Sequence, residues 1–131
     1  MQPVTNVASG GEIARVMLSL KAMISNAVKM PTIIFDEIDT GVSGKIAEAM
    51  ALIMKEMGTA GRQVLSITHL PQIAARGANH YKVAKTETPD GTRTSMIQLT
   101  SDQRVEEIAQ MLSGTVISSA ALAQANELLS L

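Results

Sequence analysis

Three carboxylates stand close together in the chain, directly after an apolar run. Asp36 and Glu37 follow Thr32–Phe35, and Asp39 comes two residues later. A hard cation such as Mg²⁺ prefers oxygen ligands, and a neighbouring carboxylate can orient or deprotonate a water molecule. Asp36 is therefore the candidate magnesium ligand and Glu37 the candidate general base. The plain alternative is a solvated strand end, which three mutually repelling carboxylates disfavour unless a cation or hydrogen-bond donors compensate.

A histidine follows the next apolar run of the chain. His69 comes directly after Gln63–Thr68. A lone histidine is more often structural than catalytic, but functional groups in open α/β sheets gather at the carboxyl ends of the strands. We therefore expect His69 to lie on the same edge of the sheet as the carboxylates. His80 is interpreted as a surface histidine and Asp90 as a turn residue.

The segment Ser9-Gly10-Gly11-Glu12 combines a helix start with two glycines. Ser9 and Glu12 have the spacing of a capping box, in which each side chain bonds the backbone N–H of the other residue. Each glycine costs up to about 1 kcal/mol in a helix relative to alanine, and glycine is favoured where a group must approach the backbone closely. Because helix starts bind anions, the segment is either a plain cap or a phosphate site.

The elements that must position these residues follow from the hydrophobic spacing. The runs 32–35 and 63–68 are predicted as parallel strands buried on both faces, joined by a helix over about 45–57. A helix over about 12–28 precedes them, and a short helix over 70–76 follows. The predicted inward positions are Ile13, Val16, Met17, Leu20 and Ile24 in the first helix, and Ile46, Met50, Ile53, Met54 and Met57 in the second.

The pattern changes in the last third of the chain. Residues 81–87 and 94–99 flank Pro89-Asp90-Gly91-Thr92, which predicts a β-hairpin. Two helices close the chain, the first capped by Ser101 or Asp102 and ending at Gly114, the second capped by Ser118 or Ser119. The predicted class is α/β, a single domain over residues 1–131 with a mainly parallel sheet, flanking helices, a hairpin near 81–99 and two C-terminal helices.

Composition narrows the function classes. Of 131 residues, 46% are hydrophobic and 18% are charged, which is enough for one domain with a core. The net charge of −1 and the presence of one Phe and one Tyr argue against a nucleic-acid surface in this chain. The chain has no cysteine, and neither a membrane-spanning run nor a signal peptide is recognised. A soluble cytoplasmic protein is the expectation.

One segment imitates a phosphate loop. Gly41–Ile46 reads Gly-Val-Ser-Gly-Lys-Ile, whereas a Walker A motif needs four residues between its glycines and Ser or Thr after the lysine. Both requirements fail, so the chain contains no Walker A motif of its own.

Taken in order, the motifs resemble those of the ABC ATPase head superfamily. Residues 8–12 resemble the signature motif, 32–37 the Walker B strand, 40–44 the D-loop and 68–69 the switch-histidine loop. Ile38–Ser43 after the glutamate resembles the SMC-type branch rather than transporter subunits, which usually have Pro-Thr-Ser-Ala-Leu-Asp there. The strings ASGGE, IIFDEIDTGVSG and SITHLPQIAA are similar to the C-terminal end of the RecN family, bacterial SMC-like proteins of DNA double-strand break repair.

This resemblance implies a role for each motif in ATP hydrolysis between two dimerised heads. In the signature motif, Ser9, Gly10 and Gly11 would contact the γ-phosphate of ATP held by a partner head, and Glu12 completes the implied nucleotide-binding set. Asp36 would serve Mg²⁺, Glu37 would be the catalytic base, and His69 would sense the γ-phosphate. The implied D-loop contacts with the other head are Thr40, Gly41, Val42 and Ser43.

The resemblance also has departures and an absence. Ala8 stands where many ABC proteins have leucine, and Ser43 stands where the D-loop usually has aspartate. The Walker A lysine, the Q-loop and the coiled coil of the family would lie in an upstream N-terminal lobe, so the chain is expected to be a fragment. Alone it should bind ATP weakly without hydrolysing it, and an uncovered apolar sheet edge should promote self-association.

Two other functions stay open at this stage. A scaffold domain would keep the fold without the chemistry. A transporter ATPase would need a membrane partner, which the residues after Glu37 disfavour. The RecN-like interpretation instead predicts no membrane, contact with DNA through the full-length protein, and a place in the bacterial cytoplasm, at the nucleoid when at work.

Overall fold

A computed structural model describes residues 12, 15–20, 23, 30–42 and 44–131 of the chain. The chain divides into two compact units, Met1–Arg76 and Gly77–Leu131. The α/β class and the order of strands and helices expected from the sequence are confirmed within the described part. The single domain expected over the whole chain stays a prediction.

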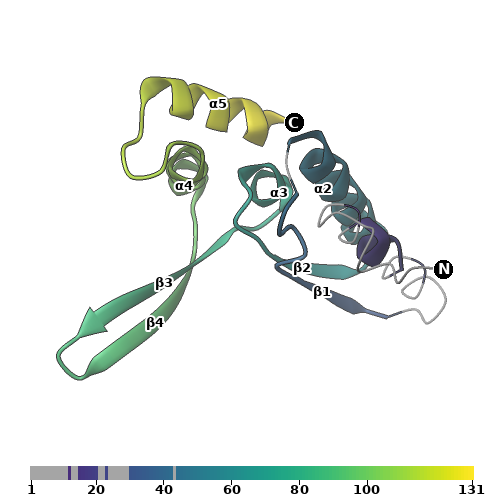
Figure 1. The fold of residues 1–131 in the computed structure, drawn as a ribbon, viewed down its shortest axis with the longest axis horizontal. Helices are drawn as coiled ribbons and strands as arrows, with labels where there is room; N and C mark the ends of the chain where they lie inside the picture. The colour runs from purple at the N-terminus through teal and green to yellow at the C-terminus, as the bar shows by residue number, and fades with distance from the viewer. Residues whose placement is uncertain (1–11, 13–14, 21–22, 24–29, 43) are drawn as a thin grey trace. The chain divides into compact units, whose positions relative to one another are not determined.

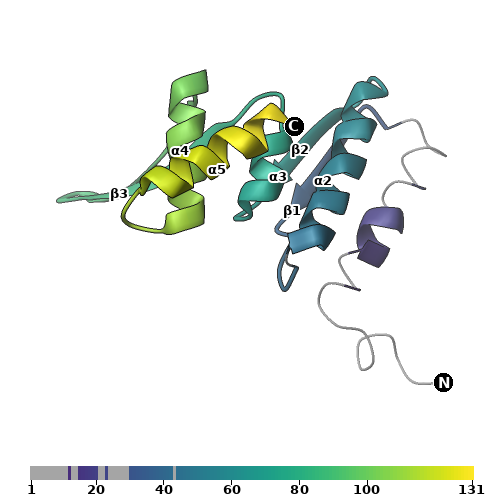
Figure 2. The same cartoon turned by 90° about the horizontal axis from the view of Figure 1, so that it is seen from above.

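The first unit is built on two parallel strands and two helices. Its elements are β1 (Thr32–Asp36), α2 (Gly44–Thr59), β2 (Gln63–Ile67) and α3 (Pro71–Arg76). β1 pairs with β2 in parallel register, with Asp36 opposite Ile67. The connecting helix α2 packs against β2 and α3 and runs beside the strand pair (Figures 1 and 2). This is the strand-helix-strand crossover that parallel pairing requires.

The core of the first unit gathers around α2. Phe35 in β1 is fully buried, and it alternates with exposed neighbours as a strand with one covered face does. The buried cluster comprises Leu18, Ile33, Phe35, Val42, Ala47, Met50, Ala51, Met54, Met57 and Ile73. Ile53, predicted to face inward, is exposed, and Ala47 and Ala51 are buried instead. The buried face of α2 thus combines two alanines with three methionines.

The first helix is described at residues 12, 15–20 and 23, all helical. Leu18 is buried there, whereas Val16, Met17 and Leu20 are exposed, so these three predicted inward positions are wrong. The other two, Ile13 and Ile24, lie outside the described residues.

The second face of the strand pair is exposed. Ile34, Leu65 and Ile67 keep 54%, 45% and 54% of their surface accessible, and we name these three residues the open face. The expectation that both strands are buried on both faces is therefore wrong for the part of the chain that the structure describes. The alternation of buried and exposed residues in β1 shows the reason, because the described helix α2 covers one face only.

The second unit is a hairpin followed by two helices. Its elements are β3 (Tyr81–Thr88), β4 (Gly91–Gln98), α4 (Ser101–Ser113) and α5 (Ser119–Ser130). β3 and β4 pair in antiparallel register and project away from α4 and α5 (Figure 1). The two helices pack on each other and bury Ile108, Ala109, Ala121 and Ala125. The predicted hairpin and both C-terminal helices are confirmed.

The helix ends in this unit are fixed by side chains. Thr100 caps α4 and forms a full capping box with Gln103. The predicted caps Ser101 and Asp102 are wrong, because both residues already lie inside the helix. Ser118 caps α5, as one of the two predicted alternatives has it. None of the described helices has the length and apolar character that a bilayer crossing requires.

Candidate functional site

The carboxyl ends of β1 and β2 meet at one edge of the strand pair. Residues 36–42 and 68–70 form this region, which we name the carboxyl edge. The backbone N–H of Glu37 donates to the carbonyl of Ile67 at 3.0 Å, so the pairing continues one residue beyond β1. The structure thereby brings the acidic residues after β1 and His69 after β2 to the same edge, as the parallel arrangement predicted.

Asp36 is the last residue of β1 and lies on the same side of the strand as the open face. It pairs in register with Ile67 and is exposed, while its neighbour Phe35 points into the core. Within the described residues, no group of three or more His, Cys, Asp or Glu side chains gathers where it could enclose a metal ion. Mg²⁺ commonly uses one or two carboxylates together with waters and substrate phosphates. An exposed Asp36 therefore fits a magnesium ion that arrives with a nucleotide.

Glu37 has an unusual backbone conformation. Its φ angle is +46°, in the left-handed region that non-glycine residues rarely adopt. Such conformations cost about 1–3 kcal/mol and cluster at functional sites, where the surrounding structure maintains them. Here the Thr40 hydroxyl donates to the Glu37 carbonyl at 3.1 Å and stabilises the turn. The exposed Glu37 side chain is thus presented at the surface on a fixed backbone.

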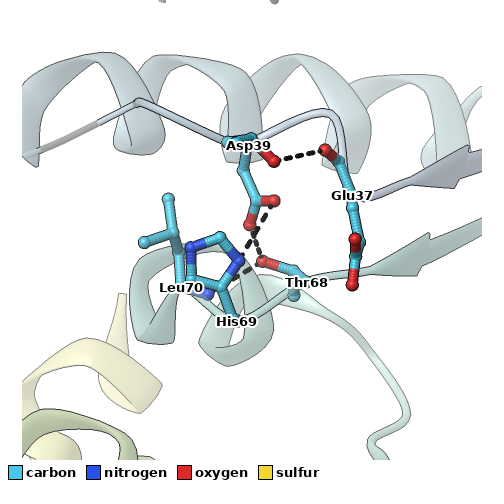
Figure 3. A network of polar contacts seen from close by, with 6 residues as sticks. Glu37, Asp39, Thr68, His69 and Leu70 are labelled. Carbon is cyan, nitrogen blue, oxygen red and sulfur yellow. Dashed lines mark hydrogen bonds and ion pairs between the residues drawn. The ribbon is translucent and has the colours of Figure 1, made fainter.

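Asp39 lies inside the carboxyl edge rather than on its surface. Only 1% of the residue is exposed. The Thr68 hydroxyl donates a short hydrogen bond to Asp39 Oδ2 and accepts one from the Leu70 backbone N–H at 3.0 Å (Figure 3). The Val42 N–H also donates to the Asp39 carbonyl at 3.0 Å. Asp39 therefore connects the turn after β1 to the segment after β2.

His69 sits at the outer side of this network. Its Nδ1 lies 3.5 Å from Asp39 Oδ1, and 63% of its side chain is exposed. Figure 3 shows the ring beside the Asp39 carboxylate, with Glu37 on the other side of Asp39 and its carboxylate turned away. The ring is therefore held near a buried carboxylate and remains accessible to a ligand.

The other predicted site residues divide into three groups. Ser9, Gly10, Gly11 and Ser43 lie outside the described residues. Glu12 is helical and exposed, and Thr40 and Gly41 are exposed in the turn after β1. Val42, which is also expected in a head-to-head contact, is only 6% exposed and packs in the core. A contact at Val42 is therefore limited to its backbone.

Sequence reasoning assigned no separate role to Asp39, and it named Thr68 only as part of the switch-histidine loop. Both are central to the network at the carboxyl edge. Two signals in the sequence point to this pair. Asp39 is a third carboxylate next to Asp36 and Glu37, and mutual repulsion favours turning one of the three away. Thr68 is a hydroxyl residue directly before His69, at the end of the neighbouring strand.

Comparisons with known proteins address the identity of this arrangement. No family model matches the chain. Curated relatives match at least 97% of the chain: the identity is 43% over 131 residues with the DNA repair protein RecN of Halalkalibacterium halodurans, and 48% over 128 residues with that of Deinococcus radiodurans. The region that the chain matches lies in the C-terminal part of these RecN proteins. The RecN protein of Vibrio cholerae is 40% identical over 98% of the chain.

The match covers only part of each RecN protein. The chain spans 23%, 22% and 23% of the length of these three relatives. A solved structure from a study of ATP-driven dimerization and DNA-stimulated activation of SMC ATPases matches with a TM-score of 0.67 and 22% identity. It covers 85% of the chain and 65% of that structure, which shows that this RecN-like chain has the fold of that SMC ATPase structure.

Proposed function

We propose that the chain is the C-terminal ATPase-head segment of a RecN-like protein of DNA double-strand break repair and recombination. The observation that carries the proposal is the carboxyl edge, where Asp36-Glu37 and His69 follow two paired parallel strands. Glu37 is presented there in a left-handed backbone conformation. The RecN relatives are named DNA repair proteins, and the SMC ATPase structure has the same fold, which supports this proposal.

In this proposal each exposed group at the carboxyl edge has one task in ATP hydrolysis. Asp36 would hold Mg²⁺, which supplies charge neutralisation for the phosphates when it is bound. Glu37 would orient and deprotonate the attacking water as the general base. His69 would contact the γ-phosphate with the ring nitrogen that does not face Asp39. The exposure of all three side chains supports these assignments.

The remaining motifs require partners. The signature motif Ser9–Glu12 would bind ATP held by a second head, so the heads work as a homodimer. Thr40, Gly41 and the adjoining backbone of Val42 and Ser43 would line the contact between heads. An upstream lobe of the same protein would supply Walker A, and DNA would be contacted elsewhere in the full-length protein. We place the protein in the bacterial cytoplasm, at the nucleoid during repair, with no membrane partner.

The test is the substitution Glu37→Gln in the full-length protein that joins this chain to its N-terminal lobe. Because a general base contributes about 10²–10⁴-fold to a rate, kcat for ATP hydrolysis should fall by at least about 100-fold. ATP-bound head dimers should accumulate, which sedimentation would detect. Glu56→Gln, an exposed position on α2 away from the carboxyl edge, is the matched control and should leave both unchanged.

Two results would contradict the proposal. Unchanged turnover in Glu37→Gln would favour a scaffold domain of the same fold, which needs no base. Robust ATP hydrolysis by the 131-residue chain alone would contradict the expected dependence on an upstream Walker A motif.

A further inference from the structure

Asp39 presents its two carboxylate oxygens to two different groups. Oδ2 accepts the hydrogen bond of the Thr68 hydroxyl, whereas Oδ1 accepts no hydrogen bond from any described residue. Among the described residues, the charged or titratable group that lies beside Oδ1 is the His69 ring, with Nδ1 at 3.5 Å. A buried acceptor without a donor is unfavourable, so a hydrogen bond from that ring nitrogen would remove an energetic defect.

Thr68 fixes the direction in which Oδ1 points. Its hydroxyl carries one hydrogen, which goes to Asp39, and it accepts the Leu70 N–H at 3.0 Å. The hydroxyl is thus held from both sides, and it holds Oδ2 in turn. The Asp39 carboxylate cannot rotate freely, and Oδ1 stays directed at His69 (Figure 3).

We propose that Asp39 is the positioning residue of the switch histidine. It accepts a hydrogen bond from Nδ1–H of His69 and so directs the opposite nitrogen, Nε2, outward, where the doubly protonated ring would donate Nε2–H to a phosphate oxygen. The proposal rests on the proposed ATPase function, since it gives the outward nitrogen its ligand. Asp39 touches no nucleotide in this scheme and acts only through His69.

The protonation pattern of the ring distinguishes this role from a merely structural one. A carboxylate only accepts hydrogen bonds, so the ring nitrogen facing it must carry hydrogen. If Asp39 only anchored the loop through Thr68, nothing would select which nitrogen of His69 is protonated. The tautomer of His69 therefore reports on the proposed contact directly.

The first test is nitrogen NMR of the whole 131-residue chain, labelled with ¹⁵N-histidine. The spectra are recorded at a pH above the range in which a histidine side chain ordinarily titrates. The chain contains only two histidines, His69 and His80, and a His80→Gln variant assigns them. We expect hydrogen on Nδ1 of His69, alone or together with Nε2. A ring with hydrogen on Nε2 only would overturn the proposal without requiring any variant at Asp39.

The second test measures Asp39→Ala in the full-length protein. Turnover should fall about 10- to 100-fold, the range typical for residues that orient a functional side chain. KM for ATP should stay within about twofold, because the substitution removes orientation rather than ground-state binding. In the labelled chain, the Nδ1–H tautomer of His69 should be lost while the His80 signal is unchanged.

Thr68→Val provides a second variant if Asp39→Ala does not fold. It keeps the side-chain shape but removes the donor that directs the carboxylate, so a smaller loss in the same direction is expected. Asp90→Ala, which removes a carboxylate at the exposed hairpin tip, is the control and should change neither readout.

The outcomes separate this proposal from the ATPase function. If Glu37→Gln abolishes turnover and Asp39→Ala leaves it intact, the positioning role is wrong and the ATPase function stands. Reduced turnover with an unaltered His69 tautomer would also overturn it, since that pattern indicates a structural role only. If neither substitution affects turnover, the proposed ATPase function itself fails.

Discussion

The open face predicts that the 131-residue chain associates with itself. Fully burying an Ile or Leu side chain contributes about 1.5–3 kcal/mol. Ile34, Leu65 and Ile67 are each about half exposed, so covering them would add about 1 kcal/mol per residue, or about 3 kcal/mol for one copy of the face. Replacing all three with serine should then raise the dissociation constant at least about 100-fold.

Sedimentation across a concentration series measures this effect. The wild-type chain should shift toward dimer with concentration, and the triple serine variant should remain monomeric over the same range. The matched control replaces Val83, Met96 and Ile97 of the hairpin with serine. These residues are 62%, 69% and 56% exposed, so the control removes a similar apolar surface from another place and should leave the association intact.

Two results would refute this reasoning. One is monomeric wild-type chain up to about 1 mM, which would leave association weaker than about −4 kcal/mol. The other is an equal loss of association in the control, which would show that general surface hydrophobicity, rather than the open face, drives it. An N-terminal lobe that covers this face should compete with self-association when it is added.

Two further predictions concern the second unit. Burial lowers the pKa of His80, and the positive charges of Arg104 and Lys82 act in the same direction, whereas Glu107 opposes them. As the pH falls, His80 therefore gains its proton in the unfolded chain before it does so in the folded chain. The free energy of unfolding should therefore decrease between about pH 7.5 and about pH 5.5 in urea titrations, and His80→Gln should flatten this dependence. Thr100→Ala should destabilise the chain by about 1 kcal/mol through loss of the α4 cap, whereas Ser101→Ala should change almost nothing in the same measurement.

The sequence predicted the elements well wherever local chemistry determines them. Apolar β-branched runs gave β1 and β2, and turn residues gave the hairpin between Tyr81 and Gln98. The placement of Asp36 and His69 at the same edge of the strand pair followed from parallel pairing alone. These features depend on residues that are close in sequence or on a general rule of chain topology.

Burial and capping were harder to predict, because they depend on which of several suitable residues the fold selects. Thr100, Ser101 and Asp102 are all good helix caps, and only the extended backbone of Thr100 makes it the one that is used. In α2, the hydrophobic pattern favoured Ile53, yet the buried face holds Ala47 and Ala51. Periodicity ranks side chains by polarity, whereas contact between elements also depends on their size.

In the acidic segment after β1, too, the fold decides which side chains are buried, and the sequence pattern does not. Three carboxylates in four residues argued for a compensating cation, because like charges repel. The structure separates them by direction instead. Asp36 closes the strand on the exposed side, Glu37 turns away in its left-handed conformation, and Asp39 is buried against Thr68 and His69.

This separation changes which residue supports which part of the proposed chemistry. Because the three carboxylates point in different directions, their mutual repulsion does not by itself require a cation. The proposed Mg²⁺ site therefore rests on the exposed position of Asp36 at the end of β1. The third carboxylate lies beside the histidine: its Oδ1 accepts no hydrogen bond from a described residue and is 3.5 Å from His69 Nδ1. The acidic segment thus divides into an exposed pair, which the proposed function assigns to the nucleotide, and a buried carboxylate, which the proposed positioning role assigns to His69.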